Sequence, residues 1–146
     1  MSVRKVFLLA VGLVLAGCLA VGLVFSGCSS ERIYEGYPIR YWRQQLKKSD
    51  YMARWRACSA FHTIGREGKD AIPDLIPCLH DEHHLVRQEA ALALAKMGAD
   101  AKPAVPDLVE LLKDPIAQVR QAASSSLEHI DYPAWYEATR AQRTEE

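Results

Sequence analysis

The sequence predicts an all-α protein: a short α-solenoid of about three helical hairpins, followed by a C-terminal capping helix. The main observation is a 33-residue internal repeat, in which Ile72-Pro73-Asp74-Leu75 returns as Val105-Pro106-Asp107-Leu108. Repetition at a fixed period of this length is typical of stacked two-helix units. Apolar residues within the repeats recur at i, i+3, i+4 and i+7, which places them on one helix face. No run of β-branched residues alternates with polar ones, so we expect no strand.

Residues 1–27 have the pattern of a secretory signal. Arg4 and Lys5 precede Val6–Gly27, a stretch of 22 residues without a charge. A short basic region followed by an apolar run and small residues is typical of such signals. The segment resembles a bacterial lipoprotein signal, in which a cysteine after a small residue is lipidated and becomes the mature N-terminus.

Two cysteines could be that lipidation site. Cys28 is favoured because the polar residues Ser29-Ser30-Glu31 follow it, as expected of a tether. Cys18 follows the better lipobox, Leu15-Ala16-Gly17, but cleavage there would leave an apolar stub on the mature chain. A third interpretation is an uncleaved anchor, because about 20 apolar residues suffice to span a bilayer. All three place the globular part in the cell envelope, outside the cytoplasm and close to a membrane.

The remainder divides into a tether at 28–40, a repeat domain at 41–142 and a tail at 143–146. Cleavage before Cys28 leaves 16 Lys and Arg against 18 Asp and Glu. This near balance argues against nucleic acid as a partner, since nucleic acid requires a clustered basic face.

The three hairpins are expected at 41–65, 71–98 and 104–130. In the first, Trp42 replaces core Leu75. The second has helices at 73–80 and 82–97, with Asp81 as the N-cap between them and Gly98 at the exit. The third repeats this layout at 105–113 and 115–130, with Asp114 as the N-cap and a proline at the first helical position. A capping helix is expected at 133–142, with Trp135 covering the open end.

The sequence at 105–115, together with Val-Arg-Gln-Ala-Ala at 119–123, resembles the HEAT repeat in the short form common in bacterial proteins. The resemblance covers about residues 41–131 and is strongest in the second and third copies. It implies a ladder in which loop aspartates and arginines join neighbouring repeats, at Asp81, Arg87, Asp114 and Arg120. The first copy keeps Arg54 but has Lys48 at the position of the aspartate, which puts the N-terminal end of the ladder in question.

Chemical signals are weak. Three histidines occupy the turn at 80–84, and histidine is a good zinc or copper ligand. The repeat places an inter-helix turn there, so a solvated turn is favoured over a metal site. Cys58 and Cys78 are either buried filler or a bridge between helices, if their Cα atoms lie within about 7 Å. No nucleophile, phosphate-loop or zinc-protease motif occurs, so we expect no catalytic residue, no cofactor and no small-molecule substrate.

The surface of the second helices is the best candidate for a contact site, because the resemblance implies that these helices line the concave side. Trp55 is the expected anchor, since tryptophan often dominates binding energy. An alternative has Trp55 packing against its own tether near Tyr34 and Tyr37. The residues opposite the core stripe are Trp55, Ser59, His62, Gln88, Leu92, Gln121, Ser125 and Glu128.

These observations predict a membrane-tethered, non-catalytic scaffold that binds another protein. One alternative is an enzyme or enzyme subunit, because some HEAT-like proteins resemble phycobilin lyases, although this chain is much shorter. The other is a structural envelope component that assembles with itself end to end.

Overall fold

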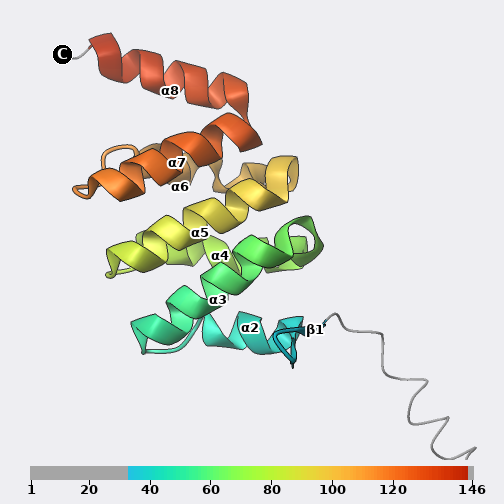
Figure 1. The fold of residues 1–146 in the computed structure, drawn as a ribbon. Coiled ribbons are helices and arrows are strands. Elements are labelled where there is room, and N and C mark those ends of the chain that lie inside the picture. Colours follow the sequence, from blue (N-terminus) through green and yellow to red (C-terminus); the bar gives the residue numbers. More distant parts are fainter. Residues whose placement is uncertain (1–32, 145–146) are drawn as a thin grey trace, which may run out of the picture. The chain divides into compact units, whose positions relative to one another are not determined.

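The computed structural model describes residues 33–144, and these form an all-α solenoid, as predicted (Figure 1). Helices α3 (Tyr51–Ile64), α5 (His84–Met97) and α7 (Ala117–Ile130) stack in one layer, with α3 packed on α5 and α5 packed on α7. The short helices α4 (Ile72–Leu75) and α6 (Val105–Leu111) lie behind that layer. Residues 1–27, which carry the predicted signal, lie outside the described residues.

The N-terminal end of the stack differs from the expected tether. Strands β1 (Ile33–Tyr34) and β2 (Tyr37–Pro38) form an antiparallel hairpin, and α2 (Ile39–Gln45) follows it directly. The two turn residues, Glu35 and Gly36, both have positive φ (50° and 79°), which suits a tight hairpin turn. The expectation of no strand and of a tether through residue 40 is therefore wrong for this segment.

Aromatic side chains hold the hairpin against α2. The indole nitrogen of Trp42 donates a hydrogen bond to the backbone carbonyl of Tyr34 at 3.2 Å. Tyr37 stacks on Tyr41 with ring centroids 4.3 Å apart. Trp42 itself is buried, as expected for the residue that replaces core Leu75.

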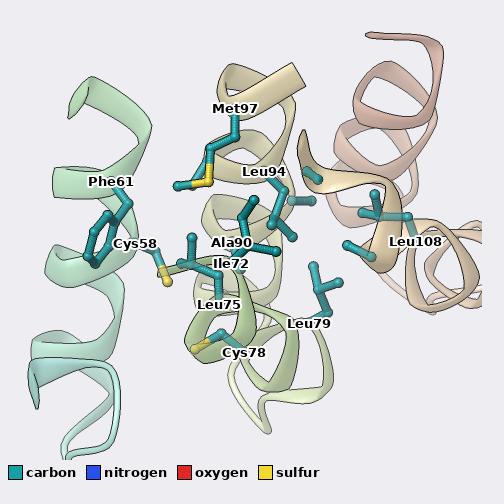
Figure 2. Close-up of a cluster of buried hydrophobic side chains, with 14 of the residues drawn as sticks. Cys58, Phe61, Ile72, Leu75, Cys78, Leu79, Ala90, Leu94, Met97 and Leu108 are labelled. Carbon is teal, nitrogen blue, oxygen red and sulfur yellow. The ribbon is translucent and has the colours of Figure 1, made fainter. Parts of the chain in front are cut away.

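The core runs along the stack between the two helix layers (Figure 2). Leu75, Leu94 and Leu108 are fully buried, which confirms the predicted register. Phe61 from α3 and Met97 from α5 fill the core between neighbouring repeats. Because each two-helix unit is too small to bury its own apolar face, neighbouring units do so for one another.

The first α-helix of the second repeat is shorter than predicted. This helix was expected at 73–80, but α4 ends at Leu75 and a 3₁₀ segment, η2 (Ile76–His80), follows. Pro77 explains the break, because it has no N–H to continue the α-helical bonding. Two further 3₁₀ segments, η1 (Gly65–Ala71) and η3 (Gly98–Ala104), connect the repeats.

The second helices of repeats two and three begin two residues later than predicted. His83 is the N-cap of α5 and Ile116 is the N-cap of α7, so neither Asp81 nor Asp114 is an N-cap. Each carboxylate instead accepts a hydrogen bond from the backbone N–H two residues later, of His83 at 2.9 Å and of Ile116 at 2.8 Å. These are turn contacts that precede the helix. The predicted exit of the second repeat is confirmed, because Gly98 ends α5 with φ of +66°.

The C-terminal helix α8 (Tyr132–Thr144) packs on α7 and continues two residues beyond the predicted end. Trp135 is half-buried, and its indole nitrogen donates to the Ser124 hydroxyl at 2.9 Å. None of the helices in residues 33–144 is both long and apolar enough to span a membrane.

Candidate functional site

Arginine–aspartate pairs fix the spacing of the second helices. Arg54 in α3 donates from Nε and Nη2 to the two carboxylate oxygens of Asp81, at 2.6 and 2.9 Å. Its remaining nitrogen, Nη1, donates to the backbone carbonyls of Lys48 and Ser49, at 2.8 and 2.6 Å. One guanidinium thus closes the turn of its own repeat and binds the next repeat. Two parallel bonds to one carboxylate also restrict the relative orientation of the two groups.

The same arrangement recurs one repeat later. Arg87 donates to both carboxylate oxygens of Asp114, at 2.7 and 3.1 Å, and to the backbone carbonyl of Asp81 at 2.8 Å. Arg120 keeps the contact within its own repeat, donating to the carbonyl of Asp114 at 2.7 Å. We call the Arg54–Asp81 and Arg87–Asp114 pairs the two rungs.

The direction of the rungs resolves the question raised by Lys48. Each arginine pairs with the aspartate of the repeat that follows it, 27 positions later. An aspartate at position 48 would have to pair with an arginine of a preceding repeat. Because Arg54 already pairs with Asp81, the lysine leaves the first rung intact.

The rungs are largely shielded from water. The side chains of Asp81 and Asp114 are each 7% exposed. Burial raises the pKa of the Asp81 carboxyl, but hydrogen bonds from Arg54 and the His83 backbone lower it further, so the pKa lies below its ordinary value. Burial also raises the pKa of Asp114, while Arg87 and the Ile116 backbone lower it with the same net result.

The layer of α3, α5 and α7 carries the residues predicted to contact a partner. We call this layer the second-helix face. Between α5 and α7 it is hollowed into a shallow groove of about 220 Å³. The groove brings together four of the predicted residues and adds two that were not predicted, Gln118 and Ala122. Its lining is Gln88, Leu92, Gln118, Gln121, Ala122 and Ser125.

The two missed residues follow from helix geometry. Gln118 lies three residues before Gln121, and Ala122 lies four residues before the buried Ser126. A helix turn of 3.6 residues therefore places Gln118 beside Gln121 on the same face. Selecting only the residues opposite the core stripe excluded the flank of α7 that forms the groove wall.

Trp55 lies in a second hollow, of about 210 Å³, on α3. Its side chain is half-buried and packs against the core. Tyr34 and Glu35 of the hairpin line the same hollow, together with Ser59. The position of Trp55 beside the hairpin matches the alternative in which it packs near Tyr34.

The remaining predicted residues lie along the same layer. His62 is half-buried, and its Nδ1 lies 2.9 Å from Oε1 of Glu89 in the next helix. Glu128 is exposed near the C-terminal end of α7. The His62–Glu89 contact therefore joins α3 to α5.

Cys58 and Cys78 are buried and free, and both belong to the core between the first two repeats (Figure 2). The hydrogen bond with Cys78 and the burial of the Cys58 thiol both raise the pKa of that thiol. A raised pKa disfavours the nucleophilic thiolate. The same bond lowers the pKa of Cys78, so the interpretation of the two cysteines as core filler is supported by their burial.

The histidine turn forms an aromatic stack. His83 lies on Tyr51 with ring centroids 3.9 Å apart, and His84 lies 4.9 Å from His83. His80 points elsewhere, with Nε2 2.8 Å from Oδ1 of Asp107. Across residues 33–144 no three His, Cys, Asp or Glu side chains are grouped to hold a metal ion.

Comparison with known proteins identifies the repeat. Residues 39–134 match the family model for HEAT repeats. No match was found among curated proteins.

Two crystal structures of engineered proteins have a similar fold. One is 23% identical with a TM-score of 0.59, covering 69% of this chain and 51% of that chain. The other is 21% identical with a TM-score of 0.60, covering 73% of this chain and 53% of that chain. The chain thus spans about half the length of the engineered proteins, and the likeness concerns the fold.

Proposed function

Because the chain belongs to the HEAT-repeat family, we propose that it is a non-catalytic scaffold that binds another protein on its second-helix face. HEAT repeats generally mediate contacts between proteins. The observation that carries the proposal is the groove between α5 and α7, which the polar Gln88, Gln121 and Ser125 line together with the apolar Leu92. A hollow lined by both apolar and polar groups is suited to one side chain of a partner and the backbone around it.

The rungs support a preformed surface. They fix the second helices through bidentate ion pairs, so the groove exists before a partner arrives. A rigid surface loses less conformational entropy on binding than a flexible one. Binding of a partner therefore requires no further ordering of the helices.

The proposal includes a membrane tether at the N-terminus. It is supported by the uncharged stretch Val6–Gly27 and by Cys28 at its end. We infer that Cys28 carries the lipid and that the repeats lie outside the cytoplasm in the cell envelope, with Cys18 as the alternative site. Mass spectrometry of the mature N-terminus, combined with palmitate labelling, distinguishes these two cysteines from an uncleaved anchor.

Site-specific photocrosslinking tests the binding face. A photoreactive amino acid at Gln88 or Gln121 in the full chain is expected to give the same discrete adduct in intact cells. The same group at Glu110, an exposed position on α6 in the other layer, serves as the control and is expected to give none. Equal adducts from both layers would contradict a binding site on the second-helix face.

A matched pair of substitutions sharpens this test. Gln121→Arg places a bulky charge in the groove, whereas Glu110→Arg places one on an exposed position of the other layer. Both positions are exposed, so both variants are expected to fold. The adduct formed from Gln88 should disappear in Gln121→Arg and persist in Glu110→Arg. Trp55→Ala, combined with a measurement of unfolding, tests separately whether Trp55 contributes to binding.

A further inference from the structure

The described part of the chain is electrically asymmetric. Residues 33–66 contain seven Lys and Arg but only two Asp and Glu, whereas residues 67–144 contain eight against thirteen. One of the seven, Arg54, is buried in the first rung. Arg66 lies beside Gly98 at the exit of α5, so the positive excess of the N-terminal end comes from the remaining cations, while the rest of the domain is acidic.

The excess of positive charge is concentrated on α2 and the turn after it. Arg40, Arg43 and Lys47 follow one another at helical spacing, and with Gln44 and Asp74 they line a shallow hollow of about 230 Å³. Asp74 binds two of these cations, accepting from Arg43 Nε at 2.6 Å and lying 2.8 Å from Lys47 Nζ. Lys48 is exposed beside them. Residues 39–50 contain four Lys and Arg against Asp50 alone, and Asp74 adds a second carboxylate, so this region keeps an excess of positive charge.

Exposed apolar and aromatic side chains lie at the same end. The side chains of Ile33 and Tyr37 in the hairpin are 71% and 48% exposed. Met52, at the start of α3, is 45% exposed. Tyrosine together with apolar residues and Lys or Arg is the composition of segments that lie in the headgroup region of a membrane.

The chain connects this surface to the proposed lipid. Cys28 precedes Ile33 by five residues, a distance of at most about 18 Å for a fully extended chain. A lipid on Cys28 would thus hold the hairpin and α2 within reach of the headgroups. The acidic remainder of the domain would be repelled by an anionic bilayer, which favours the basic end as the side that faces the membrane.

We propose that Ile33, Tyr37 and the cations of α2 form a surface that docks on anionic phospholipid headgroups. We call it the basic N-terminal surface; it comprises Ile33, Tyr37, Arg40, Arg43, Lys47 and Lys48. The inference rests on the tether in the proposed function. It adds that the repeats are oriented on the membrane, so that the second-helix face is presented in a fixed direction.

Vesicle experiments with the full-length chain test docking of this surface separately from the tether. The membrane-bound protein is reconstituted into phosphatidylcholine alone or into equal amounts of phosphatidylcholine and phosphatidylglycerol. Co-sedimentation with both vesicles reports the tether, and amide hydrogen exchange in Ile39–Gln45 reports docking. Exchange is expected to be slower with phosphatidylglycerol, and the difference should vanish at high salt, where the screening length falls to about 3 Å.

A charge-matched pair of variants locates the surface. Arg40→Gln/Lys47→Gln/Lys48→Gln removes three of its cations, and docking should weaken by about fivefold for each cation at the headgroups. Lys69→Gln/Lys96→Gln/Lys113→Gln removes three exposed cations elsewhere and should keep the native protection. Thermal unfolding of both variants, with the salt titration of the native chain, separates loss of docking from loss of folding.

Three outcomes would overturn the inference. Co-sedimentation without protection of α2 would leave the tether standing and reject the docking surface. Protection that rises with protein concentration regardless of lipid would instead assign this surface to a second copy of the chain. A full chain that sediments with neither vesicle would reject the tether itself.

Discussion

The junction between α3 and α5 and the junction between α5 and α7 use the same ion pair but different buried contacts. The rung distances agree closely, with Nε to carboxylate distances of 2.6 Å for Arg54 and 2.7 Å for Arg87. The first junction is filled by Cys58 and Phe61. In the second, the Ser126 hydroxyl donates to the carbonyl of Ala91 on the neighbouring helix at 2.8 Å. The residue 33 positions before Ser126 is an alanine, which has no hydroxyl.

This difference separates two contributions to stacking. The rung is constant and sets the register between helices, whereas the buried filler varies with the side chains available. Packing can change from one junction to the next because volume can be conserved in several ways. An ion pair with two parallel hydrogen bonds has far fewer acceptable geometries.

Removing an arginine tests whether the rungs are equivalent. Arg54→Ala and Arg87→Ala are each expected to lower the free energy of unfolding by about 3–5 kcal/mol, because each leaves a buried carboxylate without its partner. Arg120→Ala is the control, since the exposed Arg120 donates only to carbonyls of its own turn, and about 1 kcal/mol is expected. Urea unfolding measures all three. If Arg87→Ala and Arg120→Ala lower the free energy of unfolding equally, the rung contributes no more than a contact within one turn.

Truncating the core tests whether the two junctions also share packing. Leu94→Ala on α5 and Leu108→Ala on α6 should each cost about 2–5 kcal/mol, because both side chains are fully buried. Leu85→Ala, at a position 39% exposed, is the matched control and should cost much less. Urea unfolding again gives the values. A loss below about 0.5 kcal/mol at Leu94 would contradict the register of the stack.

Acid is expected to weaken both rungs together. The folded pKa values of Asp81 and Asp114 lie below the ordinary value, so the unfolded chain takes up protons first as the pH falls. Their stabilisation is complete above the ordinary pKa of about 3.9 and disappears as the pH falls through the lowered folded values. Denaturant unfolding across this range should show the loss. Asp81→Asn with Asp114→Asn should flatten the dependence, and an unchanged slope would show that other groups cause it.

The smallest effect is expected at the contact unique to the second junction. Ser126→Ala removes a buried hydroxyl whose single proton is shared between the carbonyls of Ala91 and Ala122, and about 1 kcal/mol should be lost. Ser125→Ala, at a half-buried position in the groove, provides the comparison and should change stability less. Thermal unfolding can resolve the two. If Ser126→Ala is neutral, the second junction has no contribution beyond the rung and apolar packing.

The repeat period was sufficient to predict the solenoid. Self-similarity at 33 residues identified the stacked hairpins, and helical spacing placed Leu75, Leu94 and Leu108 in the core. Both signals come from the core, which every repeat must provide in the same way. Local features that serve one repeat alone have no second copy to reveal them.

The errors in the prediction have local causes. Asp81 was assigned as a helix cap because its side chain and position suit one, but α5 begins only at His84, so the carboxylate binds Arg54 and the turn N–H of His83 instead. The hairpin was missed although Glu35-Gly36 between Tyr34 and Tyr37 is a recognisable turn signal. Pro77 shortened α4 in the second repeat alone, since the corresponding residue in the third is Glu110.

The candidate contact site was predicted only in part. Helix geometry selected Gln88, Leu92, Gln121 and Ser125, which the structure brings into one groove. The environment of Trp55 depends on a hairpin from an earlier part of the chain, so spacing within α3 could not determine it. To predict contacts between repeats, one must know how far each helix is displaced along its neighbour.

The rungs also give the stack of repeats a direction. The second and third repeats each offer a carboxylate backward, and the first and second each use a guanidinium forward, so a copy that keeps both groups can pair on either side. Duplicating residues 72–104 would insert another Asp81 and Arg87 and regenerate an equivalent bond at each new boundary. This protein therefore provides a unit from which longer rods could be assembled by gene duplication, with the ion pairs kept and only the buried packing between the copies adjusted.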